Sequence, residues 1–197
     1  MNFLAHLALA PPAPAHLMGN LLGDFAKGTA ESLWDRFPSA IVPGLLMHRA
    51  IDQFTDQHPL LHRDKQRFSP HLHRYAGIAI DIIYDHFLSR HWNQFYQQPL
   101  EHFITNAYST IEAHPEWWIG DFPAAFQDMK QYDWLRTYAT RHGIQVTLER
   151  VSQRSRFLTP LADCYADFIQ HYHAIEQNFL KLYPQLQDFA LSGKPNH

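Results

Sequence analysis

The sequence predicts an all-α fold, a single-domain helical bundle over residues 1–197. Three observations support this prediction. No segment longer than a few residues alternates apolar and polar side chains, as a half-buried strand would. Apolar side chains instead recur every three or four residues, which places them on one face of a helix. A chain that is 46% hydrophobic and 18% charged is also too apolar to be disordered.

The clearest helix covers residues 161–189. Its apolar residues step by four and three positions in turn, and they are Leu161, Tyr165, Phe168, Tyr172, Ile175, Phe179, Leu182, Leu186 and Phe189. Pro160 stands at its start, where proline is tolerated. Pro184 lies inside the pattern and lacks a backbone donor, so we expect the last turns to kink or to form a separate short helix.

A second long helix is expected over residues 70–96. It is apolar nearly all round, which is typical of a central, buried helix. A third is expected over 39–57, between the Pro38-Ser39 start signal and His58-Pro59. The shorter helices are expected at 2–9, 15–27, 99–113, 121–141 and 143–155. No repeat or linker divides the chain, so residues 97–197 are expected to pack around the central helix.

Composition excludes several classes of protein. The 16 Lys+Arg against 19 Asp+Glu give a net charge of −3, which argues against a general nucleic-acid binder. No apolar stretch approaches the ~18 residues of a membrane span. The lone Cys164 excludes an intramolecular disulfide and thiolate zinc clusters. The apolar N-terminus has no Lys or Arg before its apolar run, so we expect no signal peptide and a cytoplasmic protein.

The central helix carries charged groups that a core does not favour. Asp81 and Asp85 are four residues apart and share a face, and no Lys or Arg lies within one turn of them. Two buried carboxylates cost several kcal/mol unless a cation compensates. A metal ion is the compact solution, and the adjacent His86 is a natural extra ligand.

Three more apolar segments hold similar groups. His48 and Asp52 are four apart on an inward-facing stripe, and imidazole with carboxylate suits Mn, Fe or Zn. Asp24 lies in GNLLGDF and His6 in NFLAHL. Each residue alone is explained by a hydrogen-bonded core histidine, a helix cap or an ion pair. Because four segments share the anomaly, a metal centre is the better hypothesis.

Signatures of other chemistries are missing from the sequence. It has no G-x-S-x-G, P-loop, G-x-G-x-x-G or H-E-x-x-H motif. The Glu-x-x-His ligand pairs of di-iron bundles are also absent, and the inward acids are aspartates.

Four strings resemble those of the acyl carrier protein phosphodiesterases, also called ACP hydrolases. They are MNFLAHL (1–7), GNLLGDF (19–25), MHRAIDQFTD (47–56) and IDIIYDHFLSRHW (80–92). These strings occur in order over roughly the first half of the chain. The C-terminal half is similar only in its length and helical character.

The resemblance implies a reaction, a cofactor and a fold. The family hydrolyses the phosphodiester between 4′-phosphopantetheine and the serine of holo-acyl carrier protein. It uses a divalent metal, with Mn²⁺ favoured over Mg²⁺, Fe²⁺ or Zn²⁺, and it is a distant relative of the HD-domain phosphohydrolases, so an HD-domain-like bundle is expected. The adjacent His-Asp pair of the HD signature is not found here, since His48 and Asp52 are four apart and Asp85-His86 is reversed.

The expected metal ligands are Asp24, His48, Asp52 and Asp85. Three other groups are expected to be further ligands, to position ligands or to act as general acid or base, and they are His6, Asp81 and His86. One imidazole could protonate the leaving serine alkoxide.

A basic docking surface is also expected, because acyl carrier proteins are acidic. The segment 62–74 carries Arg63, Lys65, Arg67 and Arg74 against Asp64 alone, and it lies between the two helices that hold expected ligands. The cluster Arg150, Arg154 and Arg156 is the competing candidate.

Two alternatives stay open at this level. One is an HD-type phosphohydrolase acting on a nucleotide or another small phosphoester, which shares the metal site but needs no protein dock. The other is a non-enzymatic helical binding protein, in which the buried Asp and His side chains form a satisfied polar network.

Overall fold

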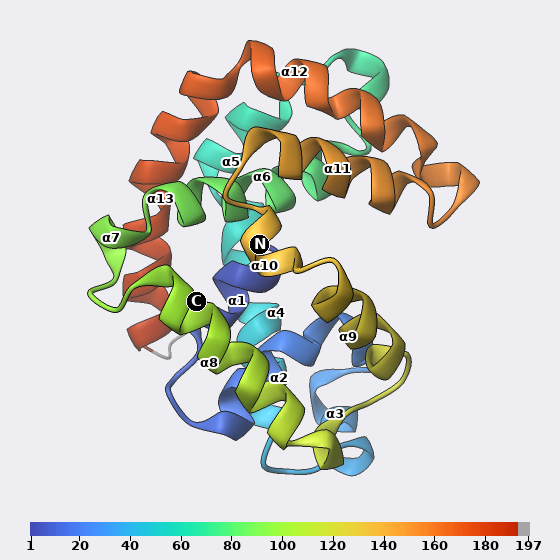
Figure 1. The fold of residues 1–197 in the computed structure, drawn as a ribbon, viewed down its shortest axis with the longest axis vertical. Helices are drawn as coiled ribbons and strands as arrows, with labels where there is room; N and C mark the ends of the chain where they lie inside the picture. Colours follow the sequence, from blue (N-terminus) through green and yellow to red (C-terminus); the bar gives the residue numbers. More distant parts are fainter. Residues whose placement is uncertain (193–197) are drawn as a thin grey trace.

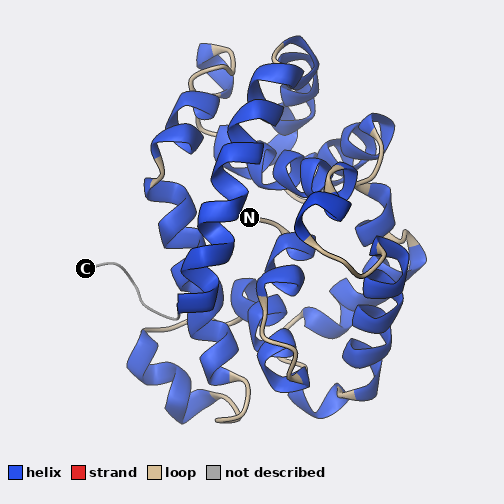
Figure 2. Cartoon of the chain, turned by 90° about the vertical axis from the view of Figure 1, so that its left-hand side faces the viewer, coloured by secondary structure: helices blue, strands red, loops and turns tan. Residues whose placement is uncertain are grey.

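Helices form the regular structure of residues 1–192, the part of the chain described by this computed structural model (Figure 1). No strand occurs in this range (Figure 2), which confirms the all-α prediction for it. The α-helices are α1 (Phe3–Leu9), α2 (Pro14–Leu22), α3 (Ala30–Arg36), α4 (Val42–Gln57), α5 (Pro59–Lys65), α6 (Ala76–Arg90), α7 (Trp92–Phe95), α8 (Leu100–Ala113), α9 (Phe122–Gln131), α10 (Trp134–Thr137), α11 (Arg141–Ser152), α12 (Cys164–Gln170) and α13 (Tyr172–Ser192). Short 3₁₀ helices are η1 (Gly23–Phe25), η2 (Pro70–Leu72), η3 (Pro115–Trp117) and η4 (Arg156–Asp163). None of the described helices has both the length and the apolar character of a membrane span.

The apolar central helix is α6, which contacts α1, α5, α11, α12 and α13. Its Ile83 and Phe87 are fully buried, and the Phe87 ring packs against Phe179 of α13 with centroids 6.0 Å apart. Ile78, near the start of α6, is 40% exposed and marks where the helix reaches the surface. Buried apolar side chains from Met1 to Leu186 form one cluster, so both halves of the chain share a core.

Two glycines allow α2 and α4 to cross at short range. A β-carbon at Gly19 would lie 2.8 Å from the Gly44 Cα, and one at Gly44 would lie 2.8 Å from the backbone nitrogen of Asn20. Both distances are too short for a real β-carbon, so the crossing requires glycine at each position. The crossing brings the end of α2 and the following η1 alongside the first turns of α4.

The long helices predicted from the sequence are interrupted. The predicted 70–96 helix is η2, α6 and α7, because His91 leaves the helical region at φ −107°, ψ 17°. The predicted 161–189 helix is η4, α12 and α13, with a similar break at His171. The separate short helix considered after Pro184 is not found, since α13 continues through this residue. Pro184 is exposed, so water can satisfy the carbonyl that the missing N–H leaves free.

Other boundaries also differ. Helices α3 and α5 were not expected; Thr29 caps α3 by accepting a hydrogen bond from the Ser32 amide, and Pro59 opens α5. The predicted 121–141 helix divides into α9 and α10 at Asp133, which has a left-handed φ of 45°. The third long helix begins at Val42 rather than at residue 39.

Candidate metal centre

His6 is held inside the core by a reciprocal pair of hydrogen bonds with Asn20. The Asn20 Nδ2 donates to the His6 carbonyl oxygen at 2.7 Å, which directs Oδ1 of the same amide toward the His6 ring at 3.2 Å from Nδ1. An amide oxygen only accepts, so His6 Nδ1 is the protonated nitrogen. The remaining ring nitrogen, Nε2, is therefore free to act as a ligand.

His48, on α4, is oriented in the same way by the same residue. Its Nδ1 donates to the backbone carbonyl of Asn20 at 2.7 Å. The rings of His6 and His48 stack with centroids 3.8 Å apart and an interplanar angle of 16°. Gly23 makes room for this arrangement, because a β-carbon there would overlap the His48 ring. The two Nε2 atoms thus face the same side.

Carboxylates lie where the two Nε2 atoms converge. Asp52 Oδ1 is 3.1 Å from His6 Nε2, and Asp52 Oδ2 is 3.1 Å from His48 Nε2. Asp24 Oδ1 is 3.4 Å from His48 Nε2. The structure thus brings together four of the residues predicted from the sequence. His6 comes from α1, Asp24 from η1, and His48 and Asp52 from α4.

The donor set fits a divalent cation. Ligand atoms of His6, His48 and Asp52 all lie within 4.8 Å of one another. Two imidazoles and carboxylates are typical ligands of Mn, Fe and Zn. Metal-binding histidines usually donate their second ring N–H to a fixed acceptor, and Asn20 provides that acceptor to both rings. Asn20 is the residue of the centre that the sequence analysis missed, although it lies in the GNLLGDF string.

The two imidazoles differ in their affinity for protons. Burial and the neighbouring His48 lower the pKa of His6 to about 4. Burial also disfavours charge on His48, but hydrogen bonds with Asp24 and Asp52 outweigh it and raise its pKa to about 9. Burial acts against ionised Asp52 too, yet the two imidazoles hold its pKa well below the usual value. The cluster therefore stabilises positive charge beside an ionised Asp52.

Asp81 lies at the edge of the centre, not in the group of mutually close ligand atoms. Its Oδ1 accepts a hydrogen bond from the Met1 amino group at 2.9 Å, and that amino group lies 3.4 Å from Asp52 Oδ1. The Asp81 side chain is 39% exposed and, with Asp24 and Asp52, lines a pocket. Asp81 is therefore positioned to meet a ligand that enters the pocket.

The structure does not bring Asp85 and His86 into the cluster. Asp85 is fully buried and accepts hydrogen bonds from the amides of Leu4 and Ala5, at 2.7 and 3.1 Å. These amides lie in the first turn of α1, where helices leave backbone donors unpaired. Burial raises the pKa of Asp85 to about 7 despite these bonds. Asp85 thus fixes the helix that carries His6.

His86 points to a different part of the core. Its Nδ1 donates to the Tyr138 carbonyl at 2.7 Å, and its Nε2 is 2.9 Å from the Tyr172 hydroxyl. Burial, only partly offset by the bond to Tyr138, lowers its pKa to about 4. Both ring nitrogens are occupied by protein groups, so His86 acts here as a link between α6 and the C-terminal half.

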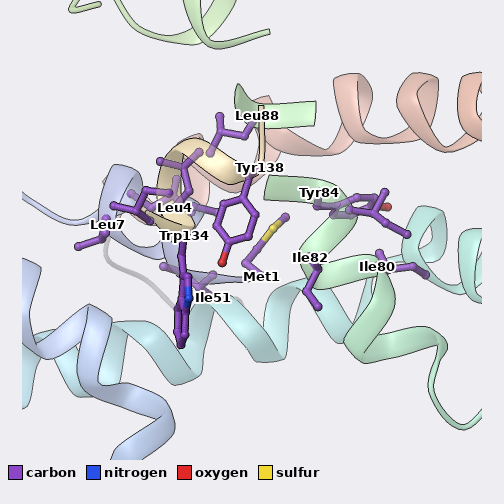
Figure 3. Packing of buried hydrophobic residues seen from close by; sticks show 14 of the residues in the cluster. Met1, Leu4, Leu7, Ile51, Ile80, Ile82, Tyr84, Leu88, Trp134 and Tyr138 are labelled. Carbon is purple, nitrogen blue, oxygen red and sulfur yellow. The ribbon is translucent and has the colours of Figure 1, made fainter. Parts of the chain in front are cut away.

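A pocket of about 250 Å³ opens beside the cluster. Its lining includes Asp24, Asp52 and Asp81, and also Arg150 and Arg154 of the segment that begins with α11. Met1, Ile82, Trp134 and Tyr138 close the pocket between them; Figure 3 shows Met1 between Ile82 on one side and Trp134 and Tyr138 on the other. Arg156, the third member of the competing basic cluster, does not line the pocket and lies over Phe157.

The basic segment 62–74 is divided between internal and exposed positions. Arg67 Nε donates to the buried Asp64 at 3.1 Å, and Lys65 Nζ donates to Asp56 at 2.9 Å. Arg63 and Arg74 are exposed and form no ion pair with a described residue. Lys65 also lies against Gly77, the neighbour of the pocket residue Ile78. Lys65 thus lies near the first turn of α6, but no residue of the segment 62–74 lines the pocket, and its docking role stays a prediction.

Comparisons with known proteins identify relatives over most of the chain. A family model described as acyl carrier protein phosphodiesterase matches residues 1–186. Proteins of that name from Pectobacterium atrosepticum and Yersinia pestis are 36% and 38% identical to this chain; the matches cover 96% and 94% of it, and 97% and 95% of the relatives. An Enterobacter protein of the same name is 38% identical, with coverage of 94% and 95%. No solved structure matches this chain.

Proposed function

The chain belongs to the acyl carrier protein phosphodiesterase family and is a hydrolase, and from that premise we propose its reaction. The proposed substrate is holo-acyl carrier protein, and the bond cleaved is the phosphodiester to the carrier's serine. A water oxygen bonds to phosphorus, the bond between phosphorus and the serine oxygen breaks, and a proton passes to that oxygen. The products are the apo-carrier and free 4′-phosphopantetheine. The proposed cofactor is a divalent metal, with Mn²⁺ as the first candidate.

The observation that carries the metal proposal is the double role of Asn20. Its side-chain amide fixes the tautomer of His6, and its backbone carbonyl fixes that of His48. Both Nε2 atoms then face Asp52 at 3.1 Å. When both nitrogens are deprotonated, their lone pairs and the carboxylate repel one another, so the arrangement favours a cation or a proton between them.

The residues divide into holding and positioning roles. His6, His48, Asp52 and Asp24 would hold the metal, while Asn20 orients the imidazoles and Asp85 holds α1 in place. The metal, when bound, supplies positive charge to the phosphodiester anion and activates water. Asp81 Oδ1 is held by the Met1 amino group, whereas Oδ2 has no hydrogen-bond partner among the described residues. Oδ2 is therefore our candidate to pass a proton to the leaving serine oxygen.

Recognition of the carrier is proposed at the basic segment 62–74. Arg63 and Arg74 are exposed, without acidic partners among residues 1–192, and the segment begins on α5, which contacts α4 and α6, the helices that carry Asp52 and Asp81. An acidic protein docked there would present an extended group to the pocket. Arg67 is less suited, because its Nε is engaged by the buried Asp64.

Family membership bears on the alternatives. A non-enzymatic binding protein is disfavoured, because proteins 36–38% identical over most of the chain are named phosphodiesterases. Action on a nucleotide or another small phosphoester stays the second candidate, since the pocket would accept such a ligand without the docking segment. The relationship to HD-domain phosphohydrolases stays a prediction from the sequence.

Mass spectrometry of holo-acyl carrier protein tests the proposal directly. We expect incubation with the protein and Mn²⁺ to remove the mass of the prosthetic group, and chelation to prevent it. An unchanged carrier mass with metal-loaded protein would contradict the reaction, and turnover of a nucleotide ester in its place would favour the second candidate.

Two aspartates one turn apart on α4 provide a matched pair of variants. Asp52→Asn removes the carboxylate between the two imidazoles and is expected to lower turnover at least 100-fold. Asp56→Asn alters an exposed carboxylate that pairs with Lys65, and turnover should stay within about twofold. Equal losses in both variants would contradict the proposed centre.

A further inference from the structure

The two arginines that line the pocket have no acidic partner among the described residues. Arg150 and Arg154 are four residues apart, at the end of α11 and just beyond it, so they project from one side. Asp24, Asp52 and Asp81 line the same pocket, yet no ion pair within 4.0 Å joins either arginine to a carboxylate of residues 1–192. Arg136 and Arg67, in contrast, pair with Glu101 and Asp64.

Aromatic rings hold these guanidinium groups. Arg150 lies over the ring of Tyr132, with its Cζ 4.2 Å from the centroid, and Arg154 lies over Trp134 at 5.5 Å. Stacking on a ring restrains the guanidinium plane and leaves its N–H edges available. Arg150 is half-buried, so its charge is only partly screened by water. The pocket lining thus presents two positioned donor groups that no described carboxylate uses.

The distribution of charge identifies the ligand. A metal held at Asp24 and Asp52 and the guanidinium groups of Arg150 and Arg154 would line the same pocket with positive charge. A phosphate ester is the anion that suits such a space, because its non-bridging oxygens accept bidentate bonds from arginine. The pocket volume of about 250 Å³ admits an extended group and excludes a folded protein.

We propose that Arg150 and Arg154 bind the phosphate group of the 4′-phosphopantetheine arm and position it against the metal centre. The identity of the arm rests on the proposed function. That the ligand is a phosphate ester rests on the charges that line the pocket. It gives the C-terminal half of the chain, through α11, a direct part in binding substrate. The indole of Trp134 lines the same pocket, and its buried Nε1 has no acceptor among the described residues.

Calorimetric titration with free 4′-phosphopantetheine tests the inference without turnover. We expect Arg150→Met and Arg154→Met each to weaken its binding to the metal-loaded protein about tenfold, the loss of one charged hydrogen bond. Arg150→Lys should lose less, since it keeps the charge but not the fork of donors. Pantetheine, which lacks the phosphate, should bind the wild type and the variants equally.

Arg156→Met is the matched control, because Arg156 belongs to the same basic cluster but lies over Phe157, outside the pocket. It should bind 4′-phosphopantetheine like the wild type. Unchanged binding in both Arg150→Met and Arg154→Met would overturn the inference, as would an equal loss in Arg156→Met. Metal content and melting temperature are measured on every variant. The inference would also be overturned if an arginine variant lost metal or stability while its affinity for 4′-phosphopantetheine relative to pantetheine stayed that of the wild type.

The outcomes separate this inference from the proposed function. If the wild type leaves holo-carrier unchanged but still binds phosphate esters through Arg150 and Arg154, the proposed reaction fails and the phosphate site stands. If the wild type converts the carrier while the arginine variants bind 4′-phosphopantetheine normally, the reaction stands and the phosphate site fails.

Discussion

The imidazole ring of His48 lies directly against the Cα of Gly23, so a β-carbon at that position would overlap the ring. Gly23 has helical backbone angles, with φ −53° and ψ −40°, that any residue adopts. Glycine is therefore required here for space and not for backbone freedom. The contact places Asp24, the next residue, within 3.4 Å of His48 Nε2. The spacing of the GNLLGDF string thus has a direct structural cause.

Gly23→Ala should displace His48 and weaken metal binding. The added methyl group forces the ring away from Asp24 and Asp52, so we expect the affinity for Mn²⁺, followed by equilibrium dialysis, to fall 10- to 100-fold. Gly77→Ala is the control, because a β-carbon there meets only Lys65 at ordinary contact distance. That variant should bind metal normally and gain roughly 0.5–1 kcal/mol of stability. Normal binding by Gly23→Ala would contradict the assignment of His48.

Chelation should lower the melting temperature of the wild type. A metal that binds only the folded state adds about 2.7 kcal/mol at a free concentration 100 times its Kd. For a chain of this size that corresponds to roughly 5–11 °C. His48→Ala should lose the response to Mn²⁺, whereas His102→Ala, which alters an exposed residue on α8, should keep it. Equal responses of these variants in differential scanning calorimetry would argue against the centre.

Asp85→Ala should destabilise the protein even without metal. It leaves the amides of Leu4 and Ala5 buried without acceptors, which costs roughly 2–4 kcal/mol. Asp56→Ala removes an exposed carboxylate that pairs with Lys65 and should leave the stability of metal-free protein within about 1 kcal/mol. Urea denaturation in the presence of a chelator compares the two. A loss for Asp85→Ala that occurs only when metal is added would instead make Asp85 a ligand.

The sequence made most of the candidate centre predictable because its members are polar groups in apolar surroundings. His6, His48, Asp52 and Asp24 each interrupt an apolar helix face, and the structure brings these four together. Spacing shows which face of a helix a residue occupies but not what lies opposite. Asp85 was therefore grouped with the ligands, although the amides of α1 lie across from it.

The same limit applies to the rest of the fold. Neither break at His91 or His171 coincides with a proline or glycine, so nothing local indicated that the long helices would divide. Pro184 is such a signal, yet its exposed position lets α13 continue. The place of Arg150 and Arg154 beside the centre depends on how α11 packs on α6, which is a long-range property.

Acid should weaken the link between α6 and α13 at Glu176. Burial raises the pKa of this carboxyl, but hydrogen bonds with His91 at 2.8 Å and His173 at 3.3 Å outweigh it and hold the pKa below 4.5. The folded state then binds this proton less tightly than the unfolded state. The stabilisation is present above pH 4.5 and is lost as the pH falls below that value.

Glu176→Gln should therefore cost roughly 1–2 kcal/mol at pH 7 and progressively less below pH 4.5. Urea denaturation at a series of pH values measures the difference from the wild type. Glu149→Gln, which changes an exposed glutamate on α11, should show a difference near zero throughout. A Glu176→Gln difference that persists unchanged into acid would contradict the role of the ionised carboxylate.

Turnover of the carrier should depend on salt through Arg63 and Arg74. These exposed residues lack acidic partners among residues 1–192, so their charge is available to an acidic protein. Raising the salt concentration screens such long-range attraction, and kcat/KM for holo-acyl carrier protein should fall steeply while that for a small phosphodiester changes little. The double variant Arg63→Ala, Arg74→Ala should reduce kcat/KM for the carrier about tenfold and flatten its salt dependence.

Lys130→Ala is the control, because it alters a cation paired with Glu112 on the side formed by α8 and α9. It should leave both kcat/KM for the carrier and its salt dependence unchanged. Arg150 and Arg154 would bind the phosphate of both substrates alike. An equal salt dependence for the carrier and the small phosphodiester would therefore contradict docking at the segment 62–74. Electrostatic recognition would then come from the pocket alone.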